Sequence, residues 1–170
     1  MQADDRFYVT GDHLSDEDYV NLTLLNYDEI AYERLSDPVL SRLALSSELY
    51  IATASLEELD RRKSPDATRV GVEVLRSRKA DGHLKALAFN VVSERDPLAA
   101  IDAVKTSIEK DDPVLVSKVA QILVDHPQMV GEPAAQALAK SVLQSCYRLN
   151  TTQPDAIEEY LVSAVAGFVK

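Results

Sequence analysis

The 170-residue sequence has little of several residue types, and each shortage argues against a class of protein. Its single cysteine, Cys146, has no partner for an internal disulfide, which agrees with a reducing compartment. The apolar helical pattern around Cys146 predicts that its thiol is buried. Only five glycines occur, and no Asn-Gly or Asp-Gly pair separates alternating apolar runs. A fold built from β-hairpins is therefore disfavoured.

Long apolar runs are also missing. No uninterrupted stretch is long enough to span a bilayer, and the N-terminus, MQADDRFYVTGDH, lacks the basic and then apolar pattern of a secretory signal. Both observations lead us to expect a cytoplasmic protein that does not enter a membrane. Hydrophobic residues make up 46% of the chain and charged residues 27%, a globular balance that predicts a single domain over residues 1–170.

Sequence motifs for catalysis are absent as well. The three histidines, His13, His83 and His126, are far apart, and none belongs to a zinc-binding motif. No nucleophile elbow or phosphate-binding glycine loop occurs. The adjacent acids Glu57 and Glu58 are interpreted as charges that open a helix, because neighbouring helix residues point in different directions. We therefore expect no enzyme activity, no cofactor and no metal site.

Proline placement indicates helices. Asp or another polar residue precedes most of the seven prolines, and an apolar helical pattern follows, which is typical of a capped helix with proline in its first turn. Ser15 with Asp18, and Ser55 with Glu58, match the capping-box pattern. The predicted helices cover residues 15–25, 28–35, 37–51, 55–63, 65–79, 82–94, 97–110, 113–125, 132–148 and 154–168. The first could instead be a strand, because YVNLTLL partly alternates.

Part of this pattern repeats after 31 residues. Asp81 is followed by apolar residues at the same spacing as Asp112, and the polar residues Asn90 and Glu94 match Gln121 and Asp125. The apolar pairs are Leu84 with Leu115, Ala88 with Val119, Val91 with Ile122, and Val92 with Leu123. A helix pair that recurs at this interval is typical of an α-solenoid, in which each pair buries its apolar face against the next.

Three segments, DPVLSRLA from Asp37, DGHLKALAFNVV from Asp81 and DPVLVSKVAQILV from Asp112, resemble the HEAT-like repeat family, including short repeats of the phycobilisome-lyase type. The resemblance covers about residues 37–168. It implies an all-α fold, a short right-handed solenoid of helix pairs. Residues 1–36 would then form an acidic N-terminal cap.

Charge is unevenly distributed along the chain, whose formal net charge is −10. Residues 1–37 contain ten acidic side chains and two basic ones, whereas residues 61–85 contain eight basic and three acidic ones. Arg62, Arg69 and Arg76 are spaced by seven, which is typical of a solvated helix face. An acidic chain without tryptophan is a poor nucleic-acid binder, so a DNA-binding HEAT-like protein is a lesser alternative, testable by salt-sensitive duplex binding.

Tyrosines gather among the N-terminal acids, which favours a surface for a basic protein partner. An end cap with tyrosines inward and acids outward explains the same cluster, and the two interpretations are compatible. A second candidate surface is the repeated polar stripe. The predicted partner-binding residues are Asp16, Glu17, Asp18, Tyr19, Tyr27, Asp28, Glu29, Tyr32, Glu33, Asn90, Glu94, Gln121 and Asp125.

These features predict a non-catalytic protein-binding module, of which the most specific form is a bacterial immunity or antitoxin-like protein that neutralises a basic toxin. A HEAT-like subunit of a modifying enzyme complex, such as a chromophore lyase, is the alternative. A co-purifying basic protein would favour the first interpretation, and a coloured tetrapyrrole adduct the second.

Overall fold

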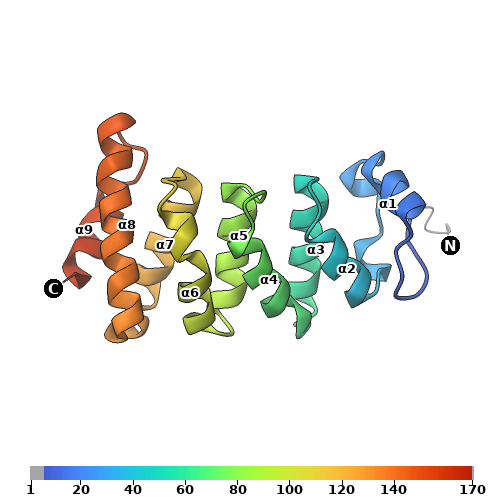
Figure 1. The fold of residues 1–170 in the computed structure, drawn as a ribbon, viewed down its shortest axis with the longest axis horizontal. Coiled ribbons are helices and arrows are strands. Elements are labelled where there is room, and N and C mark those ends of the chain that lie inside the picture. Colours follow the sequence, from blue (N-terminus) through green and yellow to red (C-terminus); the bar gives the residue numbers. More distant parts are fainter. Residues whose placement is uncertain (1–5, 170) are drawn as a thin grey trace. The chain divides into compact units, whose positions relative to one another are not determined.

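The structure is a computed structural model that describes residues 6–169. Over that range the chain forms nine α-helices and three short 3₁₀ helices, and its only extended pairing is an isolated parallel bridge between Phe7 and Ile30 (Figure 1). The predicted all-α fold is therefore confirmed for these residues, whereas the solenoid arrangement stays a prediction. No helix within them is both long and apolar enough to cross a membrane.

The chain divides into two compact units, with the boundary between Val70 and Gly71. It falls inside helix α4, Asp66–Arg76. We call the part before the boundary the N-terminal unit and the part after it the C-terminal unit, and describe each separately. This boundary differs from the predicted one between residues 1–36 and 37–168, and the single-domain organisation stays a prediction.

The N-terminal unit begins with α1, Asp16–Thr23. Its start is a capping box: the Ser15 hydroxyl accepts a hydrogen bond from the Asp18 amide at 3.0 Å, and the Asp18 carboxylate accepts from Ser15 in return. Leu14 before the helix and Leu22 in its last turn are buried. The predicted helix is confirmed here, and the strand alternative is wrong because the cap satisfies the free amides of a helix start.

The predicted helix over residues 28–35 is wrong. Two single 3₁₀ turns, Tyr27–Glu29 and Tyr32–Arg34, take its place. Ile30 between them is extended, with φ −107° and ψ 127°. The Phe7 amide donates to the Glu29 carbonyl at 2.8 Å, and the Ala31 amide donates to the Phe7 carbonyl at 2.9 Å. These bonds to a segment more than 20 residues away interrupt the helix.

The boundary predicted between the next two helices is also wrong. Helix α2, Asp37–Leu43, ends early, and α3, Leu49–Arg61, continues through the predicted cap residue Ser55. Ser46 makes the turn instead, because its hydroxyl accepts from the Glu48 amide at 2.9 Å. Ser55 is fully buried inside α3, so its spacing from Glu58 is not a capping box.

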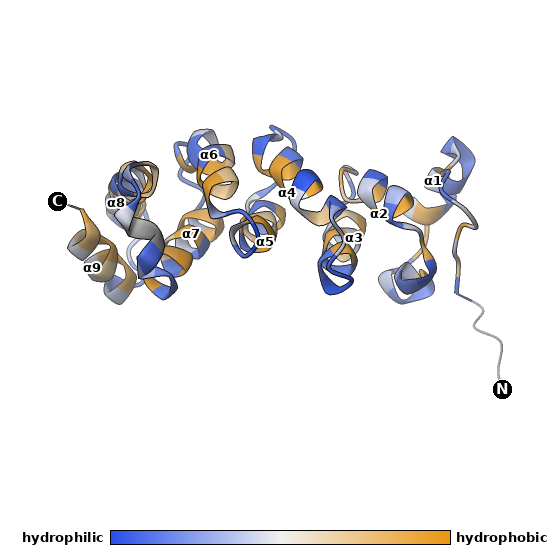
Figure 2. Cartoon of the chain, turned by 90° about the horizontal axis from the view of Figure 1, so that it is seen from below, coloured by the Kyte–Doolittle hydropathy of each residue, from blue (hydrophilic) through white to orange (hydrophobic). Residues whose placement is uncertain are grey.

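The C-terminal unit contains the rest of α4 and five further helices. They are α5 (Gly82–Ser93), α6 (Pro97–Ile108), α7 (Pro113–Asp125), α8 (Pro133–Thr152) and α9 (Glu159–Phe168), with a 3₁₀ helix over Pro127–Gly131. Helix α5 packs against α6 and α7, α7 packs against α8 and α9, and α6 packs against α8. Figure 2 shows hydrophobic and hydrophilic residues on different sides of these helices.

The 31-residue repeat corresponds to equivalent structure in α5 and α7. Asp81 accepts from the Leu84 amide at 2.9 Å, and Asp112 accepts from the Leu115 amide at 3.0 Å. All eight apolar side chains matched by the repeat are at most 4% exposed. The predicted caps and core faces of these two helices are therefore confirmed. The predicted burial of Cys146 is confirmed as well, and this burial raises the pKa of its thiol to about 11.

The last two helices start and end elsewhere than predicted. Helix α8 continues to Thr152, and α9 begins at Glu159 instead of Pro154. The Asn150 side-chain amide donates to the Ile157 carbonyl at 2.9 Å, and its oxygen accepts from the Ile157 amide at 2.8 Å. This pair of bonds closes the connecting turn, in which Asp155 has a φ of 64°. Pro154 therefore lies in a turn and opens no helix.

Candidate functional site

The three predicted acids of α1 have different environments. Asp16 is almost fully exposed and forms an ion pair with Arg42 at 2.9 Å. Glu17 is exposed and has no ion pair or hydrogen bond among the described residues. Asp18 belongs to the capping box, because its carboxylate accepts from the Ser15 hydroxyl at 2.6 Å. Asp16 and Glu17 therefore face solvent, whereas Asp18 stabilises the start of the helix.

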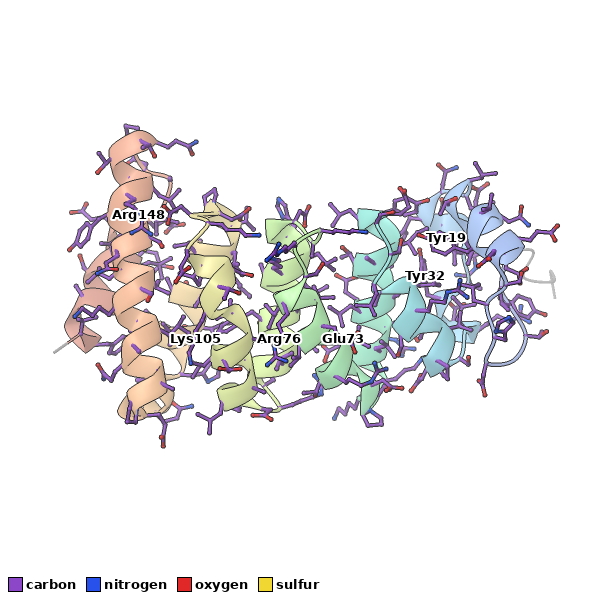
Figure 3. All side chains as sticks on the ribbon, in the orientation of Figure 1. Tyr19, Tyr32, Glu73, Arg76, Lys105 and Arg148 are labelled. Atoms are coloured by element: carbon purple, nitrogen blue, oxygen red, sulfur yellow. The ribbon has the colours of Figure 1, made fainter. Side chains whose placement is uncertain are left out.

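Tyrosine hydroxyls attach α1 to the helices that follow. The Tyr19 hydroxyl lies 3.0 Å from the Ser46 hydroxyl, and the ring is half-buried (Figure 3). Tyr50, which the sequence analysis did not single out, donates to the Leu25 carbonyl at 3.0 Å just after α1. Tyr19 thus contributes to the fold of this unit, as the end-cap interpretation expects, and has little area to offer a partner.

Tyr27 and Tyr32 form a pair with opposite exposures. Their ring centroids are 5.6 Å apart, with 34° between the planes. Tyr27 is 57% exposed, whereas Tyr32 is only 6% exposed. The Tyr32 hydroxyl has no hydrogen-bond partner among the described residues, and its burial raises the pKa of the phenol well above the ordinary value. Tyr27 is therefore the tyrosine of this pair that an incoming protein would meet.

The remaining predicted acids also divide into paired and unpaired groups. Glu29 accepts from the Asn26 backbone amide at 2.6 Å and so caps a 3₁₀ turn. Glu33 forms an ion pair with Arg6. Asp28 is exposed, with no ion pair or hydrogen bond among residues 6–169. Asp28 is thus the one acid of this group that is not engaged within the described chain.

A pocket of about 370 Å³ joins four of the predicted residues, Tyr27, Asp28, Tyr32 and Glu33. Side chains that the sequence analysis did not assign to a site complete its charged lining: Arg6, Glu57, Glu58 and Arg61. Glu57 and Glu58 had been interpreted as charges that open a helix. Because α3 begins at Leu49, they lie well inside it and reach the pocket.

Glu58 is the buried acid of this pocket, with 8% of the residue exposed. Arg61 donates two hydrogen bonds to its carboxylate, both at 2.7 Å, and Arg62 donates a third at 2.7 Å. Because these guanidinium groups stabilise the ionised form, Arg61 first, the Glu58 pKa is lowered. Glu57 beside it is exposed and has no such bond among the described residues.

The arginines spaced by seven do not share one environment. Arg62 turns inward and donates to the Leu35 carbonyl at 2.7 Å and to the Tyr32 carbonyl at 2.9 Å. Arg69 pairs with Asp66 at 3.0 Å, and within the C-terminal unit Arg76 pairs with Asp102 at 3.1 Å (Figure 3). The solvated-face interpretation therefore fits Arg69 and Arg76, whereas Arg62 supports the fold of the N-terminal unit.

The polar stripe of the C-terminal unit repeats its internal bonds as well as its residue types. The Asn90 amide donates to Glu94 at 3.0 Å, and the Gln121 amide donates to Asp125 at 2.9 Å. Tyr160 of α9 donates to the Gln121 oxygen at 2.7 Å. Glu94 and Asp125 are exposed. The stripe belongs to the C-terminal unit and the tyrosine cluster to the N-terminal unit, so the predicted residues are divided between the two units.

Comparisons with models of protein families, curated proteins and solved structures find no match. No group of three or more His, Cys, Asp or Glu side chains suited to a metal ion occurs in the described part of the chain. The arrangement around Tyr27 instead offers unpaired carboxylates beside an exposed ring, which suits contact with a cationic partner.

Proposed function

We propose that this protein is a non-catalytic binding module whose N-terminal unit binds a basic protein. The observation that carries the proposal is a set of exposed carboxylates in this unit, Glu17, Asp28 and Glu57, that have no partner among the described residues. Asp28 and Glu57 line one pocket together with the exposed ring of Tyr27. Like charges gathered on one surface attract an oppositely charged partner over a distance of about 10 Å. An exposed tyrosine adds contact area with a polar tip.

The proposed architecture is a short HEAT-like α-solenoid. Two sets of contacts in the C-terminal unit support it. Helix α5 packs against α7 and α7 against α9, which makes one row of helices, and α6 packs against α8, which makes a second row. The equivalent Asp81 and Asp112 caps give both helices the same start. Stacked pairs of this kind offer a long surface for protein binding, which agrees with a module that has no reaction chemistry.

In its most specific form, the proposal is an immunity or antitoxin-like protein that neutralises a basic toxin such as a nuclease. A nuclease surface that binds phosphates is rich in lysine and arginine, and an acidic protein can cover it. The excess of ten acidic over two basic side chains in residues 1–37 supports this form. Asp18, Glu29 and Glu33 have structural partners, so the interface would use the other acids of this end.

The test begins with affinity purification from the native host and identification of the bound protein by mass spectrometry. Surface plasmon resonance at two salt concentrations then measures its binding to two variants of the N-terminal unit and to one control variant. Asp16→Asn with Glu17→Gln should mainly slow association, because it removes long-range attraction. Tyr27→Ala should mainly speed dissociation, because an anchor ring is lost. Asp18 and Tyr32 are left unchanged, because the fold depends on them.

A charge-matched control comes from the other unit. Glu94→Gln with Asp125→Asn removes the same two charges from the polar stripe and should leave both rate constants unchanged. If this control alters binding while the N-terminal variants do not, the interface is the stripe and the proposal is wrong. An acidic or uncharged partner would overturn it as well.

A further inference from the structure

The pocket of the N-terminal unit has an excess of negative charge that its own arginines do not neutralise. Its lining includes four carboxylates, Asp28, Glu33, Glu57 and Glu58, against Arg6 and Arg61. Arg6 pairs with Glu33, and Arg61 pairs with Glu58. Asp28 and Glu57 remain without an ion pair in the described chain, so two negative charges border the pocket.

The walls of the pocket suit a planar cation. Tyr27 contributes an exposed ring, and tyrosine rings attract cations through their negative faces. This unit already contains such a contact, because the Arg34 guanidinium carbon lies 3.4 Å from the centroid of the Tyr8 ring. A volume of about 370 Å³ lies at the lower end of the range of about 300–1,000 Å³ for ligand pockets. It suits one side chain better than a larger ligand.

A second, independent observation concerns Tyr32 in the same pocket wall. Tyr32 is buried, and its hydroxyl has no hydrogen-bond partner in residues 6–169. The hydroxyl oxygen itself has almost no exposed area, so it is the Tyr32 ring that borders the pocket. The centroid of this ring lies 5.6 Å from that of Tyr27, so the pocket is bordered by two tyrosine rings, and both suit a planar cation.

We infer that this pocket is the anchor site for one arginine side chain of the basic partner. The guanidinium stacks on Tyr27 and donates to the carboxylates of Asp28 and Glu57. Arginine fits better than lysine, because its planar group can stack on a ring and donate to a carboxylate through two parallel bonds. The inference rests on the proposed function for the identity of the partner, but the pocket chemistry can be tested without that partner.

The probe is acetyl-arginine amide, titrated into the intact protein and followed by NMR. The expected result is a saturable shift of the amides of Asp28 and Glu57 and of the Tyr27 ring. Acetyl-citrulline amide has nearly the same shape without the charge and should not bind, and acetyl-lysine amide should bind several-fold more weakly. A variant with Asp28→Asn and Glu57→Gln should weaken arginine binding by at least about tenfold, because two charge-assisted bonds are lost.

The matched control is the variant with Glu94→Gln and Asp125→Asn, which removes two exposed charges that do not line the pocket. Its affinity for the arginine probe should stay within about twofold of the unchanged protein, because neither side chain can contact the bound guanidinium. Equal weakening in both double variants would show a diffuse acidic surface and overturn the inference. Equal shifts with citrulline, or no saturable shift, would overturn it too.

The two proposals fail separately. If the identified basic partner binds but replacing each of its arginines in turn does not weaken binding, the proposed function stands and the arginine pocket is wrong. If the arginine probe binds in the pocket but the natural partner is not basic, the pocket stands and the proposed function is wrong.

Discussion

The two units of this protein are built by different means. In the C-terminal unit, α5, α6 and α7 each start at an aspartate whose carboxylate caps the first amides, and two of the three then repeat the same buried positions. In the N-terminal unit, α2 and α3 start without a side-chain cap, and side chains far along the chain donate to backbone carbonyls of the irregular segments. Tyr50 donates to the Leu25 carbonyl, and Arg62 donates to the carbonyls of Tyr32 and Leu35.

This difference explains why the candidate binding surface lies where the helices are short and irregular. A regular helix satisfies its own interior backbone groups, so its buried side chains need no polar function and can be apolar at the same positions of each repeat. The N-terminal unit contains two of the three 3₁₀ helices, and the backbone groups beside such short turns need bonds from elsewhere. Those same turns expose Tyr27 and Asp28 beside a pocket. Four changes test this contrast, in order of decreasing expected effect.

The largest effect should come from a charge in the repeated core. Val91→Asp and Ile122→Asp each place a carboxylate at a position that is at most 4% exposed. Each should lower the free energy of unfolding by about 4 kcal/mol or more, because no partner compensates the buried charge. Urea unfolding followed by circular dichroism measures the loss. Leu98→Asp, at a residue that is 57% exposed, is the control and should change stability little. Unchanged midpoints in both core variants would contradict the assigned faces.

The corresponding change in the N-terminal unit is Arg62→Ala. It removes the donors to the Leu35 and Tyr32 carbonyls and one bond to Glu58. We expect a loss of about 3 kcal/mol, because charged donors to half-buried acceptors are lost together. The exposed pair of Arg69 with Asp66 provides the control: Arg69→Ala should cost about 0.5 kcal/mol or less. Hydrogen exchange should show the Arg62 effect at residues 27–35. Similar effects of the two substitutions would argue against long-range bonding as the basis of this unit.

A smaller effect should follow from Gly82→Ala in the C-terminal unit. An added Cβ would lie 2.0 Å from the Asp112 carboxylate oxygen, which caps α7. Displacing this cap should lower the free energy of unfolding by about 1–2 kcal/mol. At Gly167, where no atom beyond the neighbouring backbone of its own helix lies within 4 Å of the added Cβ, the same substitution should raise stability by about 0.5 kcal/mol. Thermal unfolding of both variants measures these opposite effects on stability. If Gly82→Ala leaves the unfolding temperature unchanged, the starts of α5 and α7 pack less tightly than the structure indicates.

The smallest effect concerns Lys85, which departs from the repeat because its counterpart is the buried residue Val116. Lys85 is 4% exposed, and its ammonium donates to the Ser107 hydroxyl at 2.9 Å. Burial, and secondarily the charge of Lys110, lower the Lys85 pKa, so the folded protein holds this proton less firmly than the unfolded chain. The resulting penalty is fully present below the folded pKa and disappears as pH rises through that pKa towards the unfolded value of about 10.4.

Lys85→Met should therefore raise the free energy of unfolding by up to about 1 kcal/mol at pH 7, and by less at pH 10. Urea unfolding at both pH values measures the difference. Lys105→Met, at an exposed lysine that pairs with Asp102, should show no comparable dependence on pH. A loss of stability on Lys85→Met at both pH values would mean that the bond to Ser107 outweighs the cost of burial.

The success of sequence interpretation follows the same division. The caps at Asp81 and Asp112 and the buried faces of α5 and α7 could be predicted, because a cap and a helical period each involve residues within four positions of one another. The spacing of Ser55 and Glu58 led to a wrong prediction of a helix start, because the same spacing forms a capping box only at the first turn of a helix. Ser55 instead sits on the buried face of α3, between Ile51 and Leu59.

The candidate site was predictable only in part. The cluster of Tyr27, Asp28, Tyr32 and Glu33 is visible in the sequence because these residues are neighbours in the chain. Glu57 and Arg61 lie at least 30 residues after Tyr27 in the sequence, and no local pattern indicates that they share a pocket with it. Arg6, which pairs with Glu33, likewise lines the pocket from a part of the chain far from Tyr27 in sequence.

The sequence alone therefore determined the helical content, most helix starts in the C-terminal unit, and the acidic character of the N-terminal end. Only the tertiary structure decided that Ile30 pairs with Phe7 and interrupts a helix, that Tyr32 is buried while Tyr27 is exposed, and that Glu57 borders their pocket. The physical reason is the sequence distance over which each kind of interaction acts. Capping and helical periodicity act between residues within one or two turns, whereas pockets and bridges depend on which distant segments pack together.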